Sequence, residues 1–420
     1  MVSLKNIALT VTVFLGCGLA VPAPVTTVAK PGAIIPGSFI ITLKPEVDAS
    51  KAKSHISWVK DVHRRSLTKR DAEKGVEKTY DGKSGFRGYA GSFDPATLKE
   101  IKQSPELTIL LVAAIEPNRV WKISHVPQER SLEKRDEIIQ KKSTWGLGTI
   151  SHRKKGVKEY IYDNYAGTDT YAYVIDTGVR ISHSEFEKRG KAAWTNWKGD
   201  NADTDGHGTH VAGTIAGKTY GVAKKAKIMA IKAFKGGESD TSIVLAGFNW
   251  AVNDIIKNDR TWRAVINMSV GGEKSPAVNK AVDDASKKGV VTVVASGNEN
   301  EDAAKSSPAS AASAITVGAI DANWAVADYS NWGKTVDILA PGTAVLSAGI
   351  KSNTASIEEE GTSMACPHVA GLVLYAMSVD EVEGVAAITK WLKELATPNK
   401  ITGNLRGAPN LIANNGNYEQ

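Results

Sequence analysis

The first feature of the chain is a short apolar run that begins after Lys5 and ends at Leu19. The small residues around Ala20 provide a cleavage point, and a positive start, a short apolar run and small residues together are typical of a secretory signal peptide. The run is too short to span a membrane, which takes about 20 apolar residues. We therefore predict that residues 1–20 are a signal peptide and that Cys17 is removed with it.

Residues 38–120 alternate between the twofold period of strands and the longer period of helices. Pro95, for example, opens a helical pattern at a position that suits the first turn of a helix. The predicted elements, in chain order, are Ser38–Leu43 (strand), Ala49–Arg64 (helix), Gly85–Phe93 (strand), Pro95–Gln103 (helix) and Thr108–Ile115 (strand). This order, with room for one more strand, predicts a small α+β domain of the split βαβ type.

Residues 121–144 are polar and charged, which predicts an exposed and cleavable connector. From about Trp145 short apolar runs alternate with helical stretches. The predicted strands are Tyr171–Ile175, Lys227–Lys232, Ala264–Met268, Val290–Ala295, Ala314–Val317 and Val336–Leu339. Strands that alternate with helices favour an α/β domain, a doubly wound parallel sheet covered by helices on both faces.

Composition limits both the expected partners and the expected disulfides. The formal net charge is +7, but Lys and Arg are spread along the chain, whereas a nucleic-acid-binding protein concentrates them in one stripe. We therefore expect no nucleic-acid partner. The second limit is the pair of cysteines, Cys17 and Cys366. Once the signal peptide is removed, one cysteine remains and no internal disulfide is expected.

Two stretches at expected strand ends or helix starts carry candidate chemistry. The stretch 174–178 reads Val-Ile-Asp-Thr-Gly and places Asp176 at the end of a strand; alone, such an Asp indicates a turn. The stretch 205–213 reads Asp-Gly-His-Gly-Thr-His-Val-Ala-Gly and contains His207 and His210. Zinc binding is the alternative there, but the pair lacks the Glu of a His-Glu-x-x-His motif. We expect His210 to be a packed structural histidine.

The third stretch, 361–371, reads Gly-Thr-Ser-Met-Ala-Cys-Pro-His-Val-Ala-Gly. Ser363 stands where a helix begins, and by itself it would be an N-cap. A helix N-terminus also offers free N–H groups to an oxyanion. Ala365 excludes the Gly-x-Ser-x-Gly elbow. A serine nucleophile needs a base and an acid that orients the base, and this chain supplies Asp176, His207 and Ser363 in that order.

These three stretches, with Asn-Met-Ser-Val-Gly-Gly at 267–272 and Ala-Ser-Gly-Asn at 295–298, resemble the proteinase K branch of the subtilisin family. The resemblance covers residues from about 145 to 415. It implies a serine endopeptidase with Ser363 as nucleophile, His207 as general base and then acid, and Asp176 as the group that holds the imidazole tautomer. It also implies that Asn298 and the backbone N–H of Ser363 bind the oxyanion.

The same resemblance implies that Ser269, Val270 and Gly271 pair with an extended substrate as an added strand. Protein and peptide substrates are the implied partners, and residues 38–120 resemble the inhibitory propeptide of these proteases. The expected division is therefore a signal peptide (1–20), a propeptide (21–124) that acts as an intramolecular inhibitor, and a peptidase domain (125–420) with its core at 145–415. Pocket glycines without a charged base favour broad, mainly apolar specificity.

No cofactor is expected for catalysis, but the resemblance implies a structural calcium ion. Asp337 and the backbone carbonyls of Ala312 and Ala314 would bind it, and oxygen ligands suit calcium. The sequon that starts at Asn267 lies on the presumed substrate strand, so we do not expect it to carry a glycan. The three glutamates at 358–360 would favour basic substrates or form a solvated loop; of the two we expect the loop.

Three other functions stay open. A kexin-type processing protease would need acidic pocket residues and usually a further domain and a membrane anchor. An inactive relative that only binds ligands would have lost a triad residue, and none is lost. A vacuolar enzyme also enters by a signal peptide; we expect secretion, a monomer and no membrane anchor. For maturation we expect self-cleavage near Ser124-His125, with the dibasic Lys134-Arg135 as the alternative site.

Overall fold

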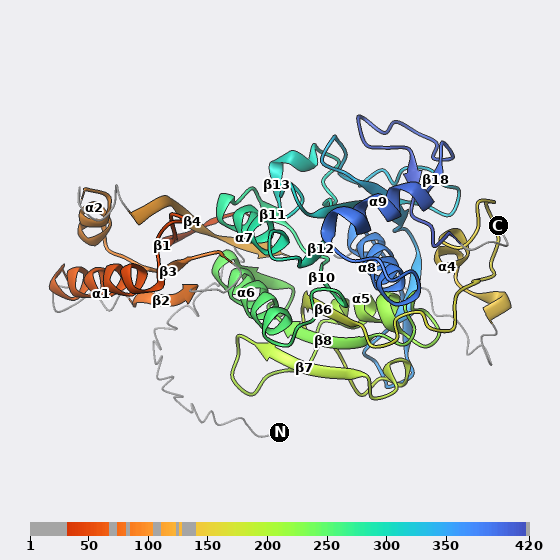
Figure 1. The fold of residues 1–420 in the computed structure, drawn as a ribbon, viewed down its shortest axis with the longest axis horizontal. Coiled ribbons are helices and arrows are strands. Elements are labelled where there is room, and N and C mark those ends of the chain that lie inside the picture. Colours follow the sequence, from red (N-terminus) through yellow and green to blue (C-terminus); the bar gives the residue numbers. More distant parts are fainter. Residues whose placement is uncertain are drawn as a thin grey trace, which may run out of the picture.

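The computed structural model describes residues 32–66, 74–80, 85–103, 111–122, 126–127 and 140–416. The predicted signal peptide, Cys17, the Ser124-His125 cleavage site and the Lys134-Arg135 site lie outside these residues. Figure 1 shows a small N-terminal domain, in red and orange, that lies against helices α6 and α7 of a larger C-terminal domain.

The N-terminal domain has the order β-α-β-β-α-β. Its elements are β1 (Ile34–Leu43), α1 (Ala49–Ser66), β2 (Gly75–Tyr80), β3 (Gly88–Ser92), α2 (Pro95–Gln103) and β4 (Val112–Lys122). Its strands are ordered β2-β3-β1-β4, and β1 is antiparallel to both β3 and β4. The predicted α+β split βαβ fold is therefore confirmed, and β2 is the additional strand for which the prediction left room.

Apolar side chains explain why these elements pack. Ile41 on β1, Val59 on α1 and Tyr89 on β3 are fully buried in one cluster between the helices and the sheet. The predicted helices differ from α1 and α2 by at most two residues. The last predicted strand, Thr108–Ile115, coincides with β4 at residues 112–115, but β4 extends seven residues further, to Lys122.

The C-terminal domain is built on a nine-stranded sheet with the order β18-β19-β15-β14-β12-β10-β6-β8-β7. These strands are β6 (Tyr171–Asp176), β7 (Gly190–Thr195), β8 (Lys227–Lys232), β10 (Ala264–Met268), β12 (Val291–Ala295), β14 (Ile315–Ile320), β15 (Ile338–Pro341), β18 (Thr397–Pro398) and β19 (Leu411–Ile412). From β7 to β19 neighbouring strands are parallel, and only the short edge strand β18 is antiparallel. Each predicted strand of this domain has a counterpart here.

Helices cover both faces of this sheet, as expected of a doubly wound fold. The helices of this domain are α4 (Trp145–Thr149), α5 (His207–Ala216), α6 (Thr241–Lys257), α7 (Pro276–Ser286), α8 (Thr362–Val379) and α9 (Val385–Leu395). In β6, Ala172 and Val174 face the cluster with α5 and α8, while Tyr173 and Ile175 face the cluster with α6 and α7. This alternation follows from the twofold period of a strand.

Short strands lie at the edges of the two domains. They are β5 (Val126–Pro127), β9 (Glu238–Asp240), β11 (Gly272–Glu273), β13 (Ser306–Ser307), β16 (Val345–Ala348) and β17 (Ser356–Glu360). β9 pairs with β4, so the sheet of the N-terminal domain continues onto the C-terminal domain. Trp121 on β4 is fully buried, so the prediction that an exposed connector starts at residue 121 is wrong at its first residue.

One helix in the described part of the chain, α8, is long and apolar enough to cross a membrane. It lies in the middle of the C-terminal domain (Figure 1), and 89% of its apolar stretch is buried inside the fold. Burial by the surrounding protein explains its composition, so α8 is a core helix.

Candidate active site

The central feature of the site is a buried pair formed by Asp176 and His207. Nδ1 of His207 lies 2.8 Å from Oδ1 and 3.0 Å from Oδ2 of Asp176. Asp176 is the last residue of β6, and His207 is the first residue of α5. Asp176 is fully buried and His207 is 1% exposed. The structure thus brings together two of the three residues on which the sequence analysis centred.

Close packing of α5 on the end of β6 makes this contact geometrically feasible. A Cβ atom on Gly208 would lie 2.1 Å from the carbonyl oxygen of Gly178 and 3.1 Å from Cβ of Asp176. Only glycine fits there, which explains the glycine after His207 in the sequence motif. The helix starts after Gly206, whose φ of 109° is readily adopted by glycine alone.

Asp203 is a supporting residue that the sequence analysis missed. Its Oδ1 accepts a hydrogen bond from Oγ1 of Thr177 (2.9 Å), and its Oδ2 accepts one from the backbone N–H of Thr209 (3.0 Å). The backbone N–H of Thr177 in turn donates to Oδ1 of Asp176 (2.7 Å). Asp203 therefore links the strand end that carries Asp176 to the helix that carries His207. No local motif around residue 203 indicated this role.

The charge of Asp176 controls the protonation of His207. Burial by itself would lower the pKa of His207, because it removes water from the imidazolium. The neighbouring carboxylate outweighs burial and raises the pKa of His207 to about 9, with a smaller contribution from Glu359. The pair therefore stabilises a positively charged imidazole, which a base needs after it accepts a proton.

Ser363 is the second residue of α8 and is 4% exposed. Its Oγ donates to the backbone carbonyl of Ser269 (2.9 Å), and Oγ of Ser269 donates to the carbonyl of Ser363 (2.8 Å). The hydroxyl of Ser363 thus points to Ser269 in this structure. Since Ser363 lies in the first turn of the helix, its backbone N–H has no intrahelical acceptor.

Asn298 lies beyond the end of β12 and is fixed by the start of α8. Its Oδ1 accepts hydrogen bonds from the backbone N–H and from Oγ1 of Thr362, both at 2.8 Å. Oγ1 of Thr362 also accepts from the backbone N–H of Gly297 (3.1 Å). With Oδ1 held by Thr362, the Nδ2 group of Asn298 is the donor that remains for a ligand.

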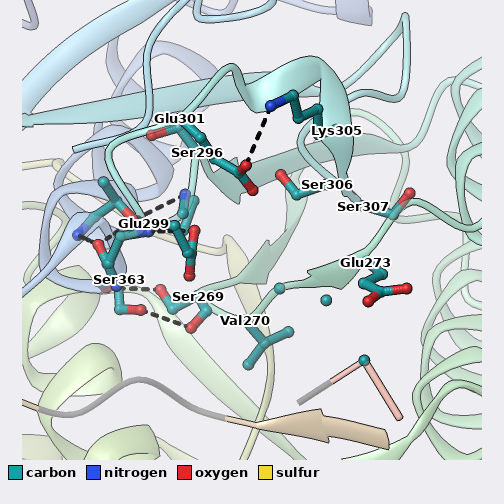
Figure 2. A pocket seen from close by; sticks show the side chains of 17 residues that line it. Ser269, Val270, Glu273, Ser296, Glu299, Glu301, Lys305, Ser306, Ser307 and Ser363 are labelled. Carbon is teal, nitrogen blue, oxygen red and sulfur yellow. Dashed lines mark hydrogen bonds and ion pairs between the residues drawn. The ribbon is translucent and has the colours of Figure 1, made fainter. Parts of the chain in front are cut away.

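Beside these residues lies a cavity of about 300 Å³ (Figure 2). The predicted substrate strand, Ser269 to Gly271, forms one wall together with Ser363. Figure 2 also places Glu299 and Glu301 around the cavity. Glu299 accepts from Nδ2 of Asn331 (2.8 Å) and Glu301 pairs with Lys305 (3.5 Å). The sequence analysis missed these carboxylates, although both closely follow Asn298, which it had placed at the site.

The three glutamates at 358–360 do not form the expected solvated loop. They belong to strand β17, which pairs with β16, and Val345 lies opposite Glu359. Glu359 is only 6% exposed, and its negative charge acts on both His207 and His210. The prediction of a loop was wrong because alternate residues of a strand face inward, whatever their charge.

His210 is buried, as expected of a packed structural histidine, and Cys366 is buried as well. Nε2 of His210 donates to the backbone carbonyl of Val345 (2.8 Å), and burial lowers the pKa of His210. Cys366 is fully buried beside Oδ1 of Asn267 (3.2 Å), and burial raises the pKa of its thiol. Asn267 is itself fully buried, and its amide donates to Oγ of Ser269 (3.0 Å), so the folded chain has no room for a glycan there.

The residues predicted to bind calcium do not fit that ion well. Ala312, Ala314 and Asp337 line one surface hollow. However, Oδ1 of Asp337 accepts from Nζ of Lys393 (2.8 Å), and Oδ2 accepts from the backbone N–H of Thr316 (3.0 Å). Within the described ranges no group of three His, Cys, Asp or Glu residues could hold a metal ion. The calcium site stays a prediction, and an ammonium group already occupies its carboxylate.

Comparisons with known proteins bear on both domains. Residues 167–408 match the subtilase family and residues 38–124 match the peptidase inhibitor I9 family. The chain is 48% identical to the subtilisin-like proteinase Mp1 of Magnaporthiopsis poae, with 99% of both chains covered. It is 46% identical to alkaline protease 1 of Aspergillus oryzae over 94% of this chain and 95% of the relative. The crystal structure of a cold adapted subtilisin-like serine proteinase superposes with a TM-score of 0.60 at 36% identity, over 65% of this chain and 98% of the other.

Proposed function

The chain belongs to the subtilase family of serine proteases and is made as a precursor with an I9 inhibitor domain; from this premise we propose that it is a secreted endopeptidase with Asp176, His207 and Ser363 as its catalytic triad. The observation that most supports the triad is the buried Asp176–His207 pair, with its 2.8 Å contact. Secretion is supported by the signal-peptide pattern of residues 1–20.

The proposed reaction begins when the hydroxyl of Ser363 turns from the carbonyl of Ser269 to Nε2 of His207. Oγ attacks the substrate carbonyl carbon while Nε2 takes its proton, and Asp176 stabilises the imidazolium that forms. Nε2 then gives the proton to the leaving amine as the peptide bond breaks. A water molecule, activated by the same base, hydrolyses the acyl-enzyme and restores Ser363.

The negative oxygen of the tetrahedral intermediate needs preorganised donors. We assign this task to Nδ2 of Asn298 and to the backbone N–H of Ser363. The two hydrogen bonds from Thr362 hold the amide of Asn298 in one orientation, so its N–H group does not reorganise during the reaction. The positive end of the α8 dipole adds to this stabilisation.

Substrates would bind as strands between β9 and the segment from Ser269 to Gly271. The inhibitor domain already binds in this way, because β4 pairs with β9 as an extended strand, with Trp121 opposite Ser239. The cavity next to Ser363 includes Gly271 and Gly297. Of its three carboxylates, Glu299 is engaged by Asn331, Glu301 by Lys305, and Glu273 by Arg119 of the inhibitor domain. This supports broad, mainly apolar specificity rather than the selection of basic side chains.

We propose further that the precursor cuts itself near Ser124-His125. β4 pairs with β9 up to Lys122, and the chain pairs again at Val126, opposite Glu360 on β17. The three intervening residues span at most about 15 Å between these anchors. Since β17 ends two residues before α8 begins at Thr362, the described residues after the expected cut pair with a strand that leads directly to Ser363, which supports a cut between the two anchors.

Maturation is tested by N-terminal sequencing of the mature enzyme and of a Ser363→Ala precursor. Self-cleavage predicts a mature chain that starts near His125 and a variant that stays uncut there. A mature chain that starts at Asp136 in both proteins would mean that a host protease cuts after Arg135, and would refute self-cleavage as the final step.

The function itself is tested by assaying the processed protein on casein with and without a fluorophosphonate, which modifies activated serines. We expect casein hydrolysis that the reagent abolishes, with the phosphonyl group on Ser363 by peptide mass spectrometry. Hydrolysis that survives full modification of Ser363, or a correctly processed protein with no hydrolysis, would contradict the proposal. The second result would favour the inactive relative that only binds ligands.

A further inference from the structure

A lysine and an aspartate form a link between α9 and the sheet, far from the catalytic residues along the chain. Asp337 directly precedes β15, and its backbone N–H donates to the carbonyl of Thr316 (2.8 Å). Thr316 donates back from its own N–H to Oδ2 of Asp337 (3.0 Å). The other oxygen, Oδ1, lies 2.8 Å from Nζ of Lys393. The carboxylate is thus held on one side by the sheet and on the other by an ammonium group.

The position of Lys393 is set by the packing of its helix. Ile388 and Leu392 on α9 are 0% and 1% exposed and anchor the helix on the domain core. Lys393 follows Leu392 directly and lies in the last turn of α9, where the helix dipole favours a positive charge. The side chain of Asp337 is 23% exposed and that of Lys393 is 43% exposed, so the pair is partly shielded from water.

The charges around the hollow balance one another without an additional divalent cation. Asp337, Glu383 and Glu394 supply three carboxylates, while Lys287, Lys390 and Lys393 supply three ammonium groups. A calcium ion bound to Asp337 would meet the charge of Lys393 at hydrogen-bond distance from the same carboxylate. To bind, the ion would first have to displace Lys393, and two positive charges would then remain uncompensated.

We propose that Lys393 acts as a built-in cation that takes the place of calcium at Asp337, so that this chain is stabilised at that site without the metal. The ammonium group neutralises the carboxylate and ties the C-terminal helix α9 to the strand β15, as a bound ion would tie the segments that ligate it. The inference does not depend on the catalytic assignment, because neither residue contacts the catalytic residues.

The test compares the thermal unfolding of the mature enzyme, blocked with a fluorophosphonate to prevent autolysis, in excess calcium and in excess chelator. We expect the same Tm in both for the wild type. Lys393→Met keeps the length of the side chain but removes the charge. It should lower Tm by roughly 1–4 °C in chelator, because a partly exposed ion pair contributes only modestly to stability.

Calcium should recover part of that loss in Lys393→Met, since the carboxylate is then available to the ion. Lys390→Met is the matched control: it lies on the same helix and its ion pair with Glu394 is exposed. It should show neither effect. The proposal is overturned if chelator lowers the Tm of the wild type and Asp337→Asn removes that response. It is also overturned if Lys393→Met is no more destabilising than Lys390→Met.

Discussion

Trp121, a large side chain of the inhibitor domain that is fully buried at the boundary with the peptidase domain, should determine how tightly the propeptide holds the enzyme. It is fully buried and belongs to the same apolar cluster as Phe234 and Val270 of the peptidase domain. Its indole ring lies against the backbone of Gly272, where an added Cβ would lie 2.8 Å from Cε2 and from Nε1. Trp121→Ala would empty this space.

The expected magnitude follows from burial. A buried tryptophan removes about 150–250 Å² from water, which at about 25 cal/mol per Å² is worth roughly 4–6 kcal/mol. The indole N–H has no hydrogen-bond partner within the described residues, and an unsatisfied buried donor costs about 1–3 kcal/mol. The net loss on truncation is then about 3 kcal/mol, which raises the inhibition constant roughly a hundredfold.

The assay measures inhibition of the mature enzyme by separately produced propeptide, residues 21–124, with a chromogenic peptide as substrate. Trp121→Phe is the control: it keeps most of the apolar area and removes the unsatisfied N–H, so its inhibition constant should stay close to that of the wild type. Gly272→Ala in the enzyme should weaken the binding of wild-type propeptide more than the binding of Trp121→Ala propeptide, because the three atoms nearest to the added methyl group all belong to the indole. An inhibition constant within threefold of the wild type for a folded Trp121→Ala propeptide would refute this reasoning.

Three further predictions concern the catalytic residues. Asn298→Asp keeps the acceptor for Thr362 but loses the N–H donor, so kcat should fall at least 10²–10³-fold with KM little changed; an effect confined to KM would instead make Asn298 a ground-state binding residue. Asp176→Asn should reduce kcat by roughly 10⁴-fold. Because the carboxylate raises the pKa of His207, the pH at which activity is lost on acidification should also fall in this variant. An unchanged acidic limb of the pH profile would show that Asp176 does not control the pKa of His207. Glu359→Gln should move the acidic limb of the kcat/KM pH profile to lower pH by a smaller amount, without reducing kcat at high pH. An unchanged pH profile would mean that Glu359 does not act on His207.

The proposed catalytic residues could be singled out from the sequence because each one lies in a short stretch with its own local structural requirements. His207 needs a glycine on either side, since α5 starts after a positive φ at Gly206 and approaches the end of β6 at Gly208. Asn298 and Ser363 also stand in short stretches whose small residues allow two chain segments to meet. A site whose geometry depends on residues that are adjacent in sequence can be recognised from the sequence alone. The strand and helix periods then locate the elements that carry the site.

The features that the sequence did not reveal depend on contacts between distant parts of the chain. Lys393 and Asp337 are 56 residues apart, and nothing near either residue indicates the other. Trp121 looked like the start of a polar connector because its apolar surroundings belong to the peptidase domain. Glu359 looked solvated because acidic residues usually are. In each case the neighbours of the side chain come from distant parts of the chain, so the local sequence pattern does not indicate them.

We propose Ser363 as the nucleophile of a triad with His207 and Asp176. The most direct test of this proposal is the turnover of a peptide substrate by a Ser363→Ala enzyme, obtained by supplying the propeptide separately and removing it by processing in trans, with circular dichroism to show that the fold is kept. We expect kcat to fall roughly 10⁶-fold while substrate binding is retained. Turnover within about tenfold of the wild type in a preparation free of wild-type enzyme would contradict it, since a triad without its nucleophile loses nearly all of its catalysis.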